Sequence, residues 1–330
     1  MSLFLVLAIV LATGTAGAAD WTNPQILVSA DQLEQNLAKP DWVVVDCRKL
    51  EDYAKGHIPG AISFGKECKK ALRDGTSRVF KSTAKYDSML SKAGIGNNSH
   101  VVFYGDMKTK SMDDATIAFW IFEYLGHDKV HVLNGGLEAW TKSKKLDTQP
   151  TIKPAAAFKA KPVKSRIATT EEVVQIAKGQ VKGVQVIDSR TKNEYAGDDI
   201  RAARGGRIPN CTANVPHEST YDTVKDPASG KDKSVGTLSA EKVAKVYADL
   251  DRNKRTIAYC QTGSRSTLTY MEMRLLGFKN PANYDDSWII YGATEKYPVE
   301  EEQRIDLSRI KKLEDDLKKL QEQLKTQAGK

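Results

Sequence analysis

The chain has 330 residues, of which 40% are hydrophobic and 28% are charged, and its formal net charge is +8. This length exceeds what one ordinary hydrophobic core supports and favours two domains, and the composition is that of a globular chain rather than a disordered one. The Lys and Arg residues are scattered and form no nucleic-acid motif. The positive charge therefore indicates a solvated surface that attracts small anions, and nucleic acid is not expected as a partner.

The N-terminal segment is typical of an export signal. Residues 1–19 contain no charged side chain, Ser2–Leu11 are almost wholly apolar, and Ala16-Gly17-Ala18 are small. This pattern predicts a signal peptide over residues 1–19, cleaved near Ala19 or Asp20, and hence a periplasmic or secreted protein, although no Lys or Arg follows Met1. The apolar run is shorter than a membrane-spanning helix, so no stable membrane insertion is expected.

The middle of the chain contains two similar copies of one pattern. Trp42–Arg48 is similar to Val184–Arg190, and Val101–Tyr104 is similar to Thr256–Tyr259. Each copy alternates β-branched runs with amphipathic helical stretches, which predicts an α/β domain whose mostly parallel sheet has helices on both faces. We expect domains over residues 20–145 and 166–300, joined by a Lys-, Pro- and Ala-rich linker over 146–165. The offset between the copies grows from 188 − 46 = 142 to 277 − 126 = 151, and we expect the nine extra residues in loops.

Residues 301–330 differ from both copies and predict a C-terminal amphipathic helix. Its apolar residues recur at spacings of three and four, and they are Ile310, Leu313, Leu317, Leu320 and Leu324. This is the seam of a coiled coil, shorter than three heptads. Packing back on its own domain and self-association through Ile310–Leu324 are both open uses of this helix.

One loop of the second copy carries the residues suited to chemistry. A buried-type strand ends at Cys260, the polar loop Gln261-Thr262-Gly263-Ser264 follows with Arg265, and a helix is predicted over Thr267–Leu276. Such a loop turns successive backbone N–H groups inward, and the helix N-terminus adds the positive end of its dipole. Both features favour an anion, so Cys260 is the candidate nucleophile in its thiolate form.

Four motifs in chain order carry a resemblance to a known family. They are Asp46-Cys47-Arg48 with Gly56-His57-Ile58-Pro59-Gly60-Ala61, Val132-Leu133-Asn134-Gly135-Gly136-Leu137-Glu138-Ala139-Trp140, Tyr259-Cys260-Gln261-Thr262-Gly263-Ser264-Arg265-Ser266, and Asp285-Asp286-Ser287-Trp288. From about residue 24 to residue 300 the chain resembles the tandem rhodanese-like domains of thiosulfate and 3-mercaptopyruvate sulfurtransferases.

The resemblance implies a mechanism. The active cysteine of that family takes up a sulfane sulfur as a persulfide and passes it to a thiophilic acceptor, which assigns Cys260 as catalytic and the loop from Gln261 to Arg265 as substrate-binding. It implies that Arg190 contacts an anionic donor such as thiosulfate, and we expect Asp188 to orient Arg190 or to cap a turn. Gly105 stands where the second copy has Cys260. The first domain is therefore expected to be inactive and to form one wall of the site.

Two departures from the family pattern leave the substrate open. Gly206-Arg207-Ile208-Pro209-Asn210 stands where the pattern has Gly-His-Ile-Pro-Gly, and Arg201 and Arg204 precede it. These arginines either support binding of a dianionic donor or solvate a loop, and Trp288 is expected to support the site. Gln261 and Thr262 match neither subfamily closely, while His57 of the first domain is expected to hydrogen-bond within its turn.

The four cysteines allow few pairings. If Cys260 stays free, at most one disulfide forms among Cys47, Cys68 and Cys211, and Cys47 at the end of an apolar run is expected to be a small core residue. The five His residues are dispersed, so no metal site is predicted, and no nucleotide-binding loop indicates a cofactor.

Two other functions remain open at this point. A phosphatase or arsenate reductase of related fold would use a Cys…Arg loop with five intervening residues, whereas only four separate Cys260 from Arg265 here. A non-enzymatic persulfide carrier, tethered to partners through Ile310–Leu324, is the other alternative.

Overall fold

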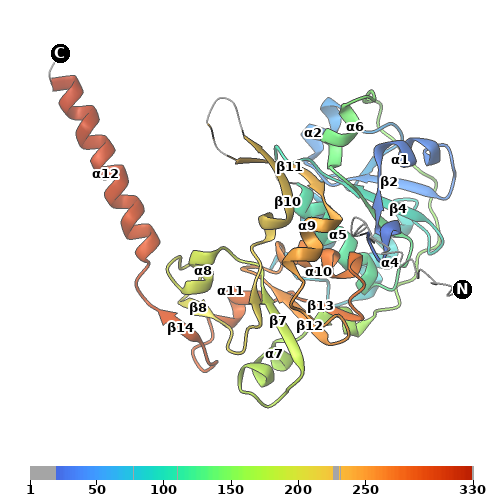
Figure 1. Ribbon diagram of the computed structural model, residues 1–330. Helices are drawn as coiled ribbons and strands as arrows, with labels where there is room; N and C mark the ends of the chain where they lie inside the picture. Colours follow the sequence, from blue (N-terminus) through green and yellow to red (C-terminus); the bar gives the residue numbers. More distant parts are fainter. Residues whose placement is uncertain (1–19, 77, 110, 226–229, 231, 329–330) are drawn as a thin grey trace, which may run out of the picture.

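The computed structural model describes residues 20–328 except 77, 110, 226–229 and 231, and it contains two α/β domains of the predicted class (Figure 1). The first sheet has the order β1-β5-β4-β2-β3, and the second has the equivalent order β6-β13-β12-β7-β9. Every strand pairing within these two sheets is parallel. The first sheet comprises β1 (Leu27–Val28), β2 (Trp42–Asp46), β3 (Ile62–Ser63), β4 (His100–Tyr104) and β5 (Val130–Leu133), and the second comprises β6 (Ile167–Ala168), β7 (Val184–Asp188), β9 (Ala213–Asn214), β12 (Arg255–Tyr259) and β13 (Asn280–Tyr284).

Helices connect the strands because parallel strands need crossovers. Several begin at polar N-caps, and Ser29 and Thr191 form complete capping boxes with Gln32 and Glu194. The helices of the first domain are α1 (Ala30–Asn36), α2 (Leu50–Lys55), α3 (Cys68–Leu72), α4 (Thr83–Lys92), α5 (Met112–Tyr124) and α6 (Gly136–Thr141). Those of the second are α7 (Thr170–Ala177), α8 (Lys192–Ala196), α9 (Ala240–Val246), α10 (Ser266–Leu275) and α11 (Ser287–Tyr291). A 3-10 turn at Pro24–Ile26 precedes β1, and two more lie at Lys164–Arg166 and His217–Thr220.

The additions to the second copy are not all loops. Part of the added chain forms an antiparallel hairpin of β10 (Tyr221–Lys225) and β11 (Asp232–Leu238). A second antiparallel pair joins β8 (Gly205–Arg207) to β14 (Glu300–Gln303). The expectation that the extra residues lie in loops is therefore wrong for the hairpin.

The two domains meet through equivalent helices. Thr116 Oγ1 on α5 lies 2.9 Å from Thr267 Oγ1 on α10, and Arg274 Nε donates to Glu123 at 2.8 Å. Both pairs have the same offset, 267 − 116 = 274 − 123 = 151. Equivalent positions thus contact each other about a local two-fold relation, as in an isologous interface. This packing places the start of α10, and the loop before it, at the domain boundary.

Both ends of the chain depart from the two-domain pattern. Helix α12 runs over Leu307–Ala328 rather than from residue 301, because residues 300–303 belong to β14. It extends away from the body, so the expectation that it packs back on its own domain is wrong (Figure 1). The predicted signal, residues 1–19, lies outside the described residues. Among the described helices, none has the length and apolar character needed to cross a bilayer.

The cysteines divide into a bonded pair and two free thiols. Cys47 after β2 and Cys68 at the start of α3 form a disulfide of 2.09 Å, and Cys211 and Cys260 are free. Cys47 is fully buried. The prediction of Cys47 as a core residue is confirmed, and its sulfur in addition anchors α3 to the sheet through the one disulfide that was left open.

Candidate active site

Cys260 lies at the carboxyl end of the central strand β12, where ligand sites of parallel sheets form. It is fully buried. Its backbone N–H donates to Ser287 Oγ at 3.1 Å, and its carbonyl accepts from Trp288 N–H at 3.0 Å. The sulfur-bearing residue is therefore fixed between β12 and the start of α11.

The loop after Cys260 presents unused hydrogen-bond donors. Within the described part of the chain, the backbone N–H groups from Gln261 to Arg265 donate to no acceptor. Gly263 has φ +70°, and a Cβ there would lie 2.5 Å from the Asp285 carbonyl oxygen, so glycine is required at this turn. Helix α10 begins directly after the loop, and its N-terminus favours negative charge. This arrangement can hold an anionic sulfur.

Arg73 of the first domain holds the loop from outside. The Arg73 side chain is 1% exposed; its Nη2 donates to the Gly263 carbonyl at 2.9 Å and to Asp285 Oδ1 at 2.8 Å, and its Nη1 donates to Ser264 Oγ at 2.9 Å. Asp285 also accepts from Val79 N–H at 2.9 Å. The first domain thus forms one wall beside the loop after Cys260, as expected, and the buried Arg73 fixes the turn at Gly263.

Arg265 is occupied by a carboxylate. Its two terminal nitrogens each donate to Glu194 at 2.7 Å, in a bidentate ion pair. Burial alone would raise the pKa of Glu194, but Arg265 outweighs it and lowers the value to about 2. Burial would likewise lower the pKa of Arg265, and Glu194 and the sulfur of Cys260 together raise it. Both terminal nitrogens of Arg265 are therefore engaged, and it has no free fork for a donor anion.

Arg190 lies in a buried network with Asp188 and Tyr259. Its Nε and Nη2 donate to Asp188, its Nη2 also reaches the Gly206 carbonyl at 2.8 Å, and its guanidinium lies 4.5 Å from the centre of the Trp288 ring. Tyr259 donates to the same carboxylate at 2.6 Å. Asp188 therefore orients Arg190, one of the two roles expected for it.

One nitrogen of Arg190 remains available. Nη1 makes no hydrogen bond with any residue that the structure describes. In the first domain, the corresponding Nη1 of Arg48 lies 3.9 Å from Asp106, which follows Gly105 as Gln261 follows Cys260. By this correspondence Arg190 Nη1 faces the loop, and its contact with a donor stays a prediction.

The other predicted arginines are engaged elsewhere. Arg204 is 2% exposed and binds the carbonyl oxygens of Gly292, Thr294 and Tyr297 together with Glu302. Arg207 stacks on Tyr195 at 4.6 Å and pairs with Glu300 and Glu301. Both arginines fix the loop to β14, and their support of a dianionic donor, one of the two open alternatives, stays a prediction. His57 Nδ1 hydrogen-bonds to the Tyr53 carbonyl oxygen within its turn, as expected, and its Nε2 lies 3.1 Å from the carbonyl oxygen of Gln149, which is remote in the chain.

The remaining loop side chains are polar, and they are buried at Gln261 and half-buried at Thr262 and Ser264. Gln261 donates to the Arg201 carbonyl at 2.5 Å, and its buried Oε1 has no partner among the described residues. Thr262 Oγ1 lies 3.5 Å from Ser264 Oγ. The Arg201 side chain is 53% exposed and lies 3.5 Å from Glu194, so it is the one of these arginines placed to meet a ligand in solvent.

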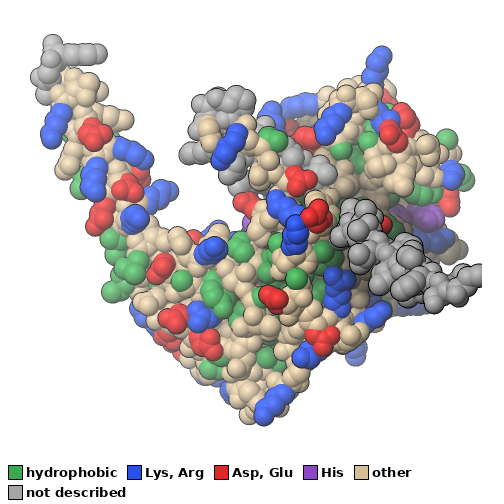
Figure 2. Space-filling view, viewed as in Figure 1, with side chains coloured by type: hydrophobic (Ala, Val, Ile, Leu, Met, Phe, Trp, Pro, Cys, Tyr) green, Lys and Arg blue, Asp and Glu red, His purple; other side chains and the backbone are tan. Residues whose placement is uncertain are grey.

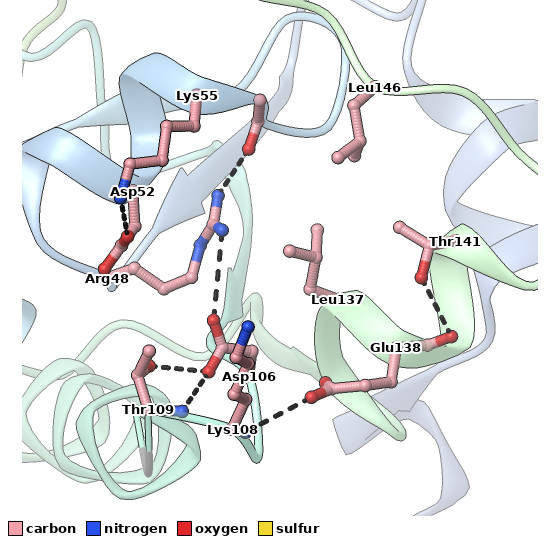
Figure 3. A pocket seen from close by; sticks show the side chains of 11 residues that line it. Arg48, Asp52, Lys55, Asp106, Lys108, Thr109, Leu137, Glu138, Thr141 and Leu146 are labelled. Carbon is pink, nitrogen blue, oxygen red and sulfur yellow. Dashed lines mark hydrogen bonds and ion pairs between the residues drawn. The ribbon is translucent and has the colours of Figure 1, made fainter.

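The first domain contains a counterpart of this site without a thiol (Figure 3). Gly105 accepts from Leu137 N–H at 2.8 Å, as Cys260 does from Trp288 N–H. The pocket beside it measures about 320 Å³ and is lined by Arg48, Asp106 and Glu138 among others. Here the loop N–H groups are used: Thr109 N–H donates to Asp106 at 2.6 Å and Met107 N–H donates to Glu138 at 2.9 Å. The carboxylates fill the place that an anion would take.

Comparison with known proteins decides the family. The model of the rhodanese-like domain matches residues 29–143 and again residues 170–289. The chain belongs to the rhodanese-like family. The thiosulfate sulfurtransferase of Corynebacterium glutamicum is 31% identical over 299 residues, which cover 85% of this chain and 92% of that protein. A Mycobacterium tuberculosis protein named "Putative thiosulfate sulfurtransferase" is 35% identical over 289 residues, 83% of this chain and 97% of the relative.

Solved structures show the same rhodanese fold. The anaerobic ergothioneine biosynthesis enzyme from Chlorobium limicola superposes with a TM-score of 0.69 at 21% identity, over 84% of this chain and 71% of that one. At this identity the likeness concerns the fold alone. The family and the named relatives together make the chain a sulfurtransferase.

Sequence reasoning missed two contributors to the site. Arg73 is remote from Cys260 in the chain, and only the docking of the segment after α3 against the second domain brings it to Gly263. Glu194 forms a capping box with Thr191, and that local signal gave no indication that its carboxylate also holds Arg265.

Proposed function

We propose that this sulfurtransferase moves the sulfane sulfur of thiosulfate, or the thiol sulfur of a donor such as 3-mercaptopyruvate, to a thiophilic acceptor through a persulfide on Cys260. The Cys260 thiolate attacks the outer sulfur of thiosulfate, a new S–S bond forms, and sulfite leaves with the electron pair of the broken bond. The acceptor then attacks the outer sulfur of the persulfide, and the Cys260 thiolate is regenerated.

The free N–H groups from Gln261 to Arg265 carry this proposal. They donate to no described acceptor and follow a buried sulfur that is negative both as thiolate and as persulfide, so the same donors are available to stabilise both states of the enzyme. The first domain has the same strand end but no thiol, and its own carboxylates occupy the loop. Sulfur transfer is therefore assigned to the second domain.

Cys211 provides a matched control for the nucleophile. Burial raises the pKa of the Cys211 thiol to about 12, and its sulfur contacts the Val186 and Ala213 carbonyl oxygens. It is thus a protonated thiol at neutral pH, outside any amide loop. Cys211→Ser should leave sulfur transfer intact, whereas Cys260→Ser should abolish it.

Steady-state kinetics with thiosulfate and cyanide tests the function. A covalent persulfide predicts ping-pong kinetics, with parallel lines when one substrate is varied at several levels of the other. Intersecting lines would contradict the covalent route. A persulfide carrier would take up sulfur once and show no sustained turnover.

We further propose that the mature protein acts outside the cytoplasm. The support is the uncharged, apolar segment before Ala19 and the small residues Ala16-Gly17-Ala18. N-terminal sequencing of protein from the native host should find a start near Ala19 or Asp20. Intact Met1 on cytosolic protein would contradict export.

A further inference from the structure

Helix α12 carries an exposed apolar stripe that its own body does not cover. Its five seam residues are between 44% and 64% exposed, and they are Ile310, Leu313, Leu317, Leu320 and Leu324. Figure 2 shows this arm standing clear of the body, with charged side chains along it. The family matches end at residue 289, so the helix lies beyond the rhodanese-like domains. A contiguous exposed apolar stripe on a soluble protein marks an interaction surface.

We propose that α12 pairs with α12 of a second copy of this chain as a parallel two-stranded coiled coil. With Ile310 at position a, the seam residues fall at a, d, a, d and a, which is the 3.5-residue repeat of a left-handed supercoil. Ile310 at a with Leu313 and Leu320 at d favours two strands, and leucines fill the other two a positions. The 22 residues of α12 supply five core layers without a polar residue between them.

The charges beside the seam select the parallel orientation. In a parallel pair, position g of one helix faces position e of the next heptad of its partner, so Arg309 meets Glu314 twice. In one antiparallel register, Asp316 faces Asp316 of the other helix and Glu314 faces Glu314, so like charges oppose each other. The other antiparallel register leaves Ile310 opposite Gln327 and forms no such ion pair. Only the parallel pair buries all five apolar residues and joins opposite charges.

The same positions argue against a lipid surface as the occupant. Glu314 and Asp316 border the apolar stripe on its two sides, whereas the lysines lie on the outer face at positions b and c. A helix lying on an anionic membrane would bring these two carboxylates to the headgroups, where basic residues are favoured. A second α12 meets Glu314 with Arg309 instead.

Sedimentation equilibrium of the full chain over a range of concentrations tests the pairing. The account predicts a reversible monomer–dimer equilibrium, because five layers make a weak coil. Leu317→Glu should raise the dimer Kd at least about a hundredfold, since it places two carboxylates in one core layer. Lys319→Glu, on the outer face of the same helix, is the matched control and should leave the Kd unchanged.

A charge exchange tests the orientation. Arg309→Glu should weaken the dimer about three- to tenfold, and adding Glu314→Arg should restore it, because the exchanged pair again has opposite signs. Thiosulfate turnover should be unchanged in all these variants, since α12 contains no residue of the active site. A monomer at all concentrations, a dimer that survives Leu317→Glu, or binding of monomers to anionic vesicles through this stripe would overturn the pairing. An unrescued charge exchange would overturn the parallel orientation.

Discussion

The loops after β4 and β12 begin with the same scaffold and then differ in what occupies them. In both domains an arginine pairs with an aspartate two residues earlier, and a tyrosine donates to the same carboxylate at 2.6 Å. After the tyrosine, the first domain has Gly105 and the second has Cys260. In the first loop, the carboxylates of Glu138 and Asp106 accept hydrogen bonds from backbone N–H groups. In the second loop, no described residue accepts from the N–H groups that follow Cys260. The comparison separates the parts that hold the fold from the parts that hold an anion.

The largest expected effect is that of removing Arg48 or Arg190, and it distinguishes the residues that hold the fold from those that hold an anion. Arg48→Ala and Arg190→Ala each leave a buried aspartate without its partner, so each should destabilise its domain by about 3–5 kcal/mol. Only Arg190→Ala should also raise the KM for thiosulfate, by roughly ten- to a hundredfold, because only Arg190 faces a loop with a nucleophile. Denaturant unfolding and steady-state kinetics measure the two effects.

Folding must be controlled in this pair of variants. Kinetics are compared at a temperature where circular dichroism shows both variants to be folded, and Arg190→Lys keeps a cation if Arg190→Ala is too unstable. Equal KM values for Arg48→Ala and Arg190→Ala would show that Arg190 is a scaffold residue only.

A smaller effect tests how the first domain acts on the loop. Arg73→Gln removes the charge-assisted hydrogen bonds to Gly263 and Ser264 without substituting any residue of the loop. The single-turnover rate of sulfur uptake should therefore fall about ten- to thirtyfold. Arg274→Gln is the matched control, because it removes an inter-domain pair with Glu123 that is remote from the loop. Equal losses in the two variants would mean that domain packing alone matters.

The smallest effect concerns stability and pH. Glu272 on α10 corresponds to Ile121 on α5, since 272 − 121 = 151, and burial raises the pKa of Glu272 to about 7. The folded state therefore retains a proton that the unfolded chain releases near pH 4.5, and stability falls as pH rises from there to 7. Glu272→Gln keeps the contacts with Thr220 and Tyr247 without ionising. It should raise the unfolding free energy at pH 8 by on the order of 2 kcal/mol and have little effect at pH 4.

A pH-independent difference between Glu272→Gln and the parent would contradict this account. It would mean that Glu272 is ionised in the folded protein at neutral pH, held by Thr220 and Tyr247 as a carboxylate.

The fold and the free loop after Cys260 could be predicted from the sequence because both depend on local patterns. β-branched runs such as Val43–Val45, followed by helical periodicity, specify the parallel sheets, and the strand-loop-helix around Cys260 specifies the amide loop. The partners of the arginines could not be predicted in this way. Arg265 pairs with Glu194, and Arg204 pairs with Glu302, although the partners are far apart in the chain. The spacing of residues in the sequence does not indicate such long-range contacts.

The disulfide and the Arg73 contacts could not be predicted from the sequence for the same reason. Pairing Cys47 with Cys68 rather than Cys211 depends on where α3 lies against β2, which is a property of tertiary packing. Arg73 follows α3 and reaches the second domain only because α5 and α10 dock the two domains.

Intact-mass analysis of the purified protein tests the central claim most directly. After incubation with thiosulfate, the chain should gain one sulfur, about 32 Da, and cyanide should remove it. Peptide mapping should place the added sulfur on Cys260, with Cys211→Ser gaining it as the parent does and Cys260→Ser gaining none. A Cys260→Ser variant that gains the sulfur, or that turns over thiosulfate at the parent rate, would contradict the account.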